Sequence, residues 1–161
     1  MNNWFECKVN YEKTMENGML KKVTEPYLVD AMSFTEAEAR IIEEIRPYIS
    51  GEFTVSGIRR MRLAELFFNE AGDRFYRIKV NFITLDEKSG SEKKTAAQML
   101  AQASDLKEAI SVLEEGMKGT MADYTIVSVI ESPLMDVFPF DANKLNKKPK
   151  TEEELLAEEK A

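Results

Sequence analysis

The sequence predicts an α+β fold in which one strand–strand–helix–strand unit occurs twice in tandem. Residues 4–68 and 75–138 align with a shift of 71 or 72 positions, and the order of residue types is kept. The tripeptide Lys8-Val9-Asn10, for example, recurs as Lys79-Val80-Asn81 (79 − 8 = 71). Such repetition is typical of a duplicated supersecondary unit. We therefore expect two pseudo-symmetric repeats that form an antiparallel-rich curved sheet with two helices on one face.

The first repeat should begin with a β-hairpin. Apolar and polar residues alternate from Trp4 to Tyr11, which is the period-two pattern of a half-buried strand. The segment Glu16-Asn17-Gly18 is a turn sequence that accepts a positive φ angle. Residues 21–30 then form the return strand, in which Pro26 indicates a sheet edge or a bulge.

A capped helix and a long strand should complete this repeat. Ser33 stands where a helix N-cap is expected, and Glu36 follows three residues later, as in a capping box. Apolar residues at helical spacing continue this helix as far as residues 47–51. Residues 53–68 are long for one strand, and Gly57 within them indicates a bulge or bend that curves the sheet.

The second repeat is expected to follow the same order. Residues 75–85 alternate like the first strand, and residues 93–103 occupy the place of the return strand. The composition of 93–103 favours a helix, but we predict a strand because the repeat requires one and tertiary context often overrides propensity. Ser104 is expected to cap a helix over 105–117, and 124–137 is the last long strand.

The composition is that of a folded protein. Of the 161 residues, 43% are apolar and 32% are charged, which excludes a mostly disordered chain. We expect one compact domain over residues 1–140, built from both repeats, followed by a mobile charged tail over 141–161. No apolar run approaches the ~20 residues that span a bilayer, and the N-terminus lacks a basic and apolar leader. We therefore expect a cytoplasmic protein without a membrane partner.

The residue types present exclude several kinds of site. The chain has no His and a single Cys, so it lacks the usual general base and the ligands of common zinc sites. It also has no aspartate-rich calcium loop and no phosphate-binding glycine loop. A carboxylate site for magnesium or calcium stays open, whereas Cys7 is expected to be a small buried apolar residue. We expect a non-enzymatic protein without a cofactor.

The net charge limits how the chain could bind nucleic acid. The formal charge is −7, and residues 141–161 hold five Lys and six acidic residues, which leaves 17 basic and 23 acidic residues, or −6, for residues 1–140. Binding by bulk charge depends on Lys and Arg that displace counterions from phosphates. Nucleic acid would therefore have to bind to a local basic stripe on the surface.

The polar sides of the predicted strands carry aromatic and cationic residues. In each repeat the first strand places an aromatic ring, cations and an Asn on one side, and the third strand of the first repeat adds arginines. Proteins that read single strands stack bases on aromatic rings and pair cations with phosphates. We hypothesise that this open face binds single-stranded nucleic acid, although the same pattern also fits packed aromatics and solubilising charges. The candidate residues are Trp4, Lys8, Asn10, Arg59, Arg60, Arg62, Phe75, Arg77, Lys79 and Asn81.

A protein-interaction module or a structural homo-oligomer is the alternative. The long outer strands have apolar ends, and an unpaired strand edge is a template for pairing with another chain. A homodimer or an accessory protein partner would use these ends. They contain Leu63, Leu66, Phe67 and Phe68 in the first repeat, and Leu134, Val137, Phe138 and Phe140 in the second.

Three segments resemble a known family. They are Trp4-Phe5-Glu6-Cys7-Lys8-Val9, residues 25–31, and the helix start over 33–38. These segments resemble a family of short uncharacterised proteins from anaerobic gut bacteria that is classified as a domain of unknown function. The resemblance covers nearly all of residues 1–140, and it implies no catalytic residue, cofactor or mechanism.

Overall fold

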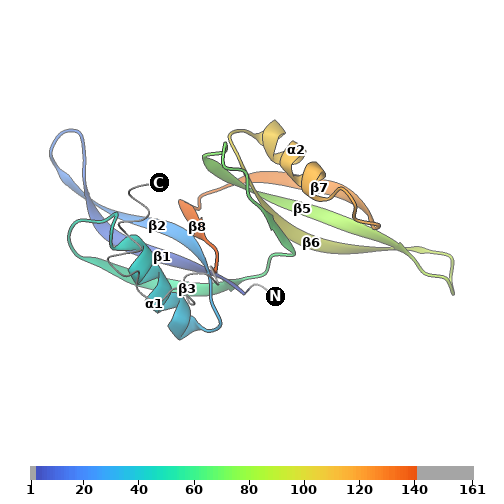
Figure 1. Cartoon of the computed structure of the whole chain (residues 1–161), viewed down its shortest axis with the longest axis horizontal. Helices are drawn as coiled ribbons and strands as arrows, with labels where there is room; N and C mark the ends of the chain where they lie inside the picture. Colours follow the sequence, from blue (N-terminus) through green and yellow to red (C-terminus); the bar gives the residue numbers. More distant parts are fainter. Residues whose placement is uncertain (1–2, 141–161) are drawn as a thin grey trace, which may run out of the picture.

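The structure is a computed structural model that describes residues 3–140. Within this part of the chain, eight strands and two helices form two four-stranded sheets, each with one helix (Figure 1). The predicted α+β class is confirmed. The two sheets follow one another along the long axis, and their long hairpins point to opposite ends of the molecule. The charged tail predicted at 141–161 lies outside the described residues.

Sheet A takes most of its strands from the first half of the chain. It contains β1 (Trp4–Thr14), β2 (Leu20–Asp30), β3 (Phe53–Met61) and β8 (Asp136–Phe138), and α1 (Phe34–Ile45) packs on one face. The strand order is β3-β1-β2-β8. β1 is antiparallel to both of its neighbours, whereas β8 is parallel to β2.

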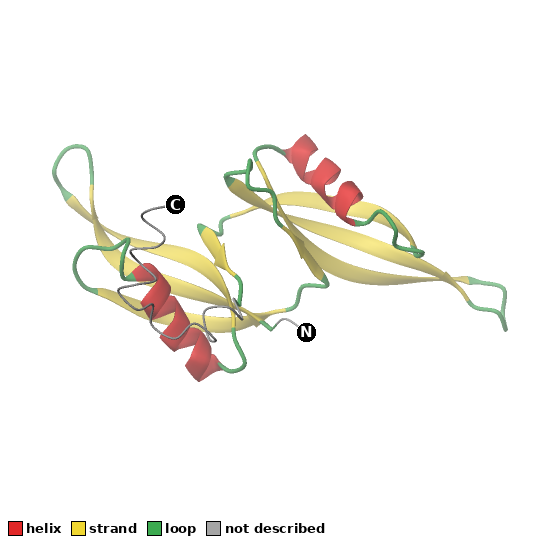
Figure 2. Cartoon of the chain, in the orientation of Figure 1, coloured by secondary structure: helices red, strands yellow, loops and turns green. Residues whose placement is uncertain are grey.

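Sheet B has the corresponding arrangement in the second half. It contains β4 (Glu65–Phe67), β5 (Arg74–Leu85), β6 (Glu92–Ala103) and β7 (Asp123–Ser132), and α2 (Leu106–Gly116) packs on one face. The strand order is β4-β6-β5-β7, and β4 is parallel to β6. Each sheet thus carries a helix on one face, as Figure 2 shows, and no helix of residues 3–140 covers the other face, which we call the helix-free face.

The chain forms two sheets where one was expected, because both long third strands break. Residues 53–68 divide into β3 and β4, and residues 124–137 divide into β7 and β8. After each break the short strand pairs with the sheet of the other half. This exchange lets Leu66 and Val137 pack in an apolar cluster between the sheets. One sheet alone would leave these side chains in contact with water, which is unfavourable for apolar surface.

The helix starts confirm the predicted caps, with one shift. Ser33 accepts a hydrogen bond from the backbone N–H of Glu36 at 3.1 Å. In the second helix the cap is Asp105, whose carboxylate accepts from the N–H of Glu108 at 2.8 Å. The prediction that Ser104 is the cap was therefore wrong by one residue. Both Asp and Ser satisfy the free N–H groups of a first turn, so composition alone could not choose between neighbours.

The segment 93–103 is a strand. The repeat predicted this strand, whereas the composition of the segment favoured a helix. β6 pairs with β5 over its whole length. Met99, Ala101 and Ala103 are buried in the apolar core under α2. Packing between sheet and helix therefore outweighs the modest helix preference of Ala and Gln.

Both outer strands contain a bulge at matching places. Lys8 is opposite Gly57 and Val9 is opposite Val55, so one extra residue, Ser56, lies in β3. Lys79 and Val80 are opposite Ser128 and Ile126 in the same way, which leaves Val127 as the extra residue of β7. The bulge predicted near Gly57 is confirmed. Its counterpart in β7 lies 71 positions later (127 − 56 = 71).

A third apolar cluster, which we call the junction cluster, joins the two sheets. It contains residues from both halves in pairs that are 71 or 72 positions apart. Such a cluster removes from water the helix-free faces of the two sheets where they meet. The pairs are Trp4 with Phe75, Leu28 with Leu100, Leu63 with Leu134, and Leu66 with Val137, and Met61 packs beside them.

We predict that Gly72→Ala destabilises the fold and that Gly57→Ala does not. A Cβ atom at Gly72 would lie 2.5 Å from the backbone N and Cα of Ala103, whereas at Gly57 it would meet no atom within 4 Å. Overpacking against backbone typically costs about 1–3 kcal/mol, and an uncrowded surface change stays within about 0.5 kcal/mol. Urea unfolding of both variants measures the difference. Equal stabilities would contradict this account of Gly72.

We also predict that Cys7 is unreactive in the native protein. Its side chain is fully buried, and burial, together with the nearby Glu6 charge, raises the pKa of the thiol to about 12. Because the pKa is raised, the nucleophilic thiolate is scarce at every pH below about 12. A thiol-specific disulfide reagent at pH 8 should therefore react only after guanidinium unfolding. Rapid stoichiometric reaction of the folded chain would overturn the burial of Cys7.

Candidate functional site

A groove with a volume of about 850 Å³ lies where the chain crosses from sheet A to sheet B. Its wall on one side comes from the end of β3 and the following residues, and its wall on the other side comes from β5 and β6. The lining contains four arginines and no Asp or Glu. The lining residues are Asn3, Trp4, Arg59, Arg60, Met61, Arg62, Leu63, Ala64, Arg77, Ala96, Ala97 and Gln98.

The crossing segment brings the arginines together. Arg59 and Arg60 lie near the end of β3, and Arg62 follows directly after that strand. The backbone N–H of Ala64 then donates to the carbonyl of Gln98 on β6 at 2.7 Å. This bond, with the parallel pairing of β4 and β6, places the crossing segment beside sheet B, where Arg77 lies on β5. The groove is therefore a product of the strand exchange.

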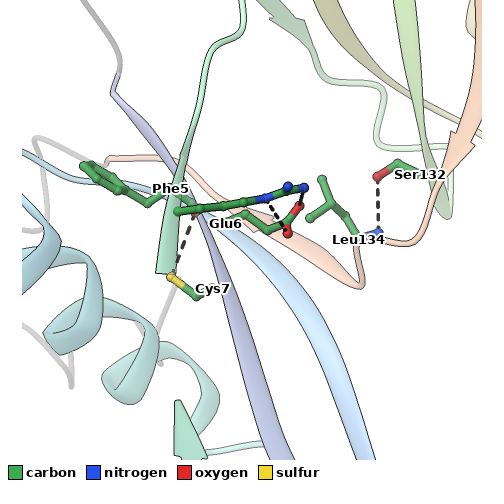
Figure 3. Close-up of polar contacts among 6 residues, drawn as sticks. Phe5, Glu6, Cys7, Ser132 and Leu134 are labelled. Atoms are coloured by element: carbon green, nitrogen blue, oxygen red, sulfur yellow. Dashed lines mark hydrogen bonds and ion pairs between the residues drawn. The ribbon is translucent and has the colours of Figure 1, made fainter. Parts of the chain in front are cut away.

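Arg59 is held by a buried carboxylate. Its Nε and Nη2 donate to the two carboxylate oxygens of Glu6 at 3.1 and 3.2 Å, across the β1–β3 pair. The Glu6 side chain is 8% exposed and the Arg59 side chain 67% exposed. Figure 3 shows Glu6 directed toward Leu134, on the opposite side of β1 from Cys7. A guanidinium has five N–H groups, so Arg59 keeps three of them for a ligand.

The other three arginines have fewer protein partners and are therefore more available to an anion. Arg60 donates to the side-chain oxygen of Asn3 at 2.8 Å. Arg62 and Arg77 are exposed, and among residues 3–140 neither side chain forms a hydrogen bond or an ion pair. Guanidinium groups bind phosphate and carboxylate oxygens in a bidentate manner. The groove can therefore hold an anion, with Glu6 as a neighbouring carboxylate that offsets part of the positive charge.

The aromatic part of the predicted interface is not available for stacking. Trp4 and Phe75 were expected to be exposed on an open face, but both are 4% exposed and belong to the junction cluster. Strand alternation did place them on the helix-free faces. That expectation was wrong about exposure because the other half of the molecule covers these faces at the junction.

The remaining candidate residues lie away from the groove. Lys8 and Lys79 are exposed on β1 and β5, and Asn10 and Asn81 are half-buried two residues further along the same strands. The amide oxygen of Asn10 accepts a bond from the Ser56 hydroxyl at 3.3 Å. The structure thus brings Arg59, Arg60, Arg62 and Arg77 together in one groove. It leaves Lys8, Asn10, Lys79 and Asn81 outside that groove.

Sequence reasoning missed several lining residues. Asn3, Ala96 and Gln98 carry no motif. Ala96 and Gln98 lie near Arg62 because of the crossing segment, and Asn3 because β1 pairs with β3. The unusual run Arg59, Arg60, Met61, Arg62 was the available signal, and it did indicate this region.

Neither a metal site nor a membrane-spanning helix is found in the described part of the chain. No three His, Cys, Asp or Glu side chains among residues 3–140 are placed so that they could hold a metal ion. Neither helix of that region is long and apolar enough to cross a membrane.

Comparisons with known proteins give a family but no function. The family model described as "Domain of unknown function (DUF4494)" matches residues 3–140. No curated protein matches the chain, and no solved structure matches it.

We predict that Trp4 acts mainly in stability. Trp4→Ala removes a ring buried at 4% exposure, and such a truncation typically costs about 3–5 kcal/mol. Tyr48→Ala is the control, because Tyr48 is 78% exposed and its loss should change stability by less than about 0.5 kcal/mol. Thermal or urea unfolding compares the two. A small effect of Trp4→Ala would show that the junction cluster contributes little.

Proposed function

We propose a function from the surface of the chain itself, because the chain belongs to the DUF4494 family, whose description states no function. The chain is a non-enzymatic binding module that holds single-stranded nucleic acid by its phosphates. The observation that carries this proposal is the groove lined by four arginines, two of which have no partner among the described residues.

The chemistry of the lining supports phosphate as the group that is bound. Arginine presents a planar set of donors that matches phosphate oxygens, and it stays charged at every physiological pH. Phosphate contacts need no aromatic platform, so the burial of Trp4 and Phe75 does not remove them. It does mean that bases contribute little stacking energy here, and that affinity depends strongly on salt.

The charge distribution favours a narrow ligand. The whole chain carries −7, so a wide duplex would also approach acidic parts of the surface. A single strand places its phosphates inside the groove, where the lining has no carboxylate. Local arginines can therefore bind it despite the unfavourable net charge.

A protein-interaction role is the second candidate, and one observation favours it. β7 is an edge strand of sheet B, and its Val127 and Ile130 are 50% and 51% exposed. Exposed edges with apolar side chains can pair with another chain. The bulge at Val127 works against continuous pairing, because bulges disrupt the ladder at an edge.

The test measures binding of labelled single-stranded DNA and RNA by fluorescence anisotropy at low and moderate salt. The double variant Arg62→Ala/Arg77→Ala should bind at least about tenfold more weakly. The slope of log K against log[salt] should become shallower by about 1.4, because each lost phosphate contact on a single strand contributes about 0.7.

The matched control is Arg74→Ala/Arg46→Ala. It removes the same charge from two exposed arginines that do not line the groove, and it should leave affinity within about twofold. Equal losses in both double variants would show that binding follows bulk charge. If the native chain does not bind at low salt, the nucleic-acid role is wrong, and light scattering should then be used to look for a homo-oligomer.

A further inference from the structure

We infer that a bound single strand leaves the groove along the helix-free face of sheet B and not along that of sheet A. This inference rests on the proposed function and specifies the path of its ligand. It depends on which charges the strand register places opposite one another on the two faces.

The helix-free face of sheet B is continuous with the groove. Arg77 lines the groove and lies on β5 between Tyr76 and Ile78, which are buried on the α2 side. Side chains alternate along a strand, so Lys79 shares the face of Arg77. Direct pairing adds Lys94, which lies opposite Ile83 on the neighbouring strand β6.

The cations on this face have neutral cross-strand neighbours. Arg77 is opposite Leu100 and Ile130, and Lys79 is opposite Gln98 and Ser128. Residues directly opposite in a sheet lie about 4.5–5.5 Å apart at their Cβ atoms. No carboxylate therefore lies directly opposite Arg77 or Lys79, and both remain available to phosphates. Lys94 shares its face with Glu92, two residues earlier on β6, and with Asp123, which is opposite Ile83 on β7.

The corresponding face of sheet A differs at the arginine that lines the groove. Arg59 is opposite Glu6 and forms an ion pair with it, and Lys22 is opposite Glu12. Two of the cations on that face thus have a carboxylate directly across the strand pair, whereas Lys8 is opposite Pro26 and Gly57. An anionic strand that left the groove along sheet A would have to compete with Glu6 for Arg59 and would then pass Glu12.

The spacing of the cations on sheet B suits an extended ligand. A strand rises about 3.3–3.4 Å per residue, so Lys79 lies about 7 Å beyond Arg77 and Lys94 roughly 20 Å beyond it. In Figure 1 sheet B extends from the junction toward the tip of the β5–β6 hairpin. Ile130, 51% exposed beside Arg77, offers apolar contact to a base. Nucleotides beyond the groove would therefore lie over β5 and its neighbours β6 and β7.

The test compares two lengths of labelled oligothymidylate. A strand of about 4 nucleotides is short enough to occupy the groove, and one of about 16 can also cover the sheet. In Lys79→Ala/Lys94→Ala, affinity for the long strand should fall at least about tenfold, and the salt slope should become shallower by about 1.4. Affinity for the short strand should stay within about twofold of the native value.

The control is Lys13→Ala/Lys22→Ala, which removes two exposed lysines from the β1–β2 hairpin and should leave both affinities within about twofold. Equal loss in both double variants, or no loss for the long strand in Lys79→Ala/Lys94→Ala, would overturn the path along sheet B. Neither result would contradict the proposal that the groove itself binds single-stranded nucleic acid. Absence of binding to both lengths by the native chain would instead overturn the proposed function itself.

Discussion

The junction cluster is the constraint on which the rest of the molecule depends. Two sheets with one helix each would leave two apolar faces in water, and Trp4, Leu28, Phe75 and Leu100 are the residues that would be exposed. Burial of such rings and aliphatic side chains is the main favourable term of folding. The short strands β4 and β8 leave their own sheets because Leu66 and Val137 complete this cluster.

The same packing explains why the arginine-lined groove exists. The segment that carries Arg62 must pass from β3 to β4, and Ala64 is hydrogen-bonded to β6 on the way. This passage places the arginines of one half beside Arg77 of the other. Stability and the candidate site are therefore linked, since a change that opens the junction would also separate the two walls of the groove.

The two halves have similar backbones but carry different charges at some equivalent positions. Seventy-one positions separate Glu6 from Arg77 and Arg59 from Ile130 (77 − 6 and 130 − 59). Glu6 neutralises part of Arg59 on sheet A, while Arg77 has no carboxylate opposite it on sheet B. Matching backbone positions thus carry different electrostatics. In an acidic chain, a basic surface of this kind must be local.

The sequence by itself determined the α+β class, the hairpins, both helices and the strand at 93–103, because period-two alternation, caps and the repeat are local or regularly spaced signals. It also indicated the arginines near residue 60. Only the tertiary structure decided that each long strand breaks, that Trp4 and Phe75 are buried, and that Arg62 and Arg77 line one groove. Those outcomes depend on contacts between halves about 70 residues apart. Strand periodicity predicts on which face of the sheet a side chain lies, but it does not predict which other element covers that face.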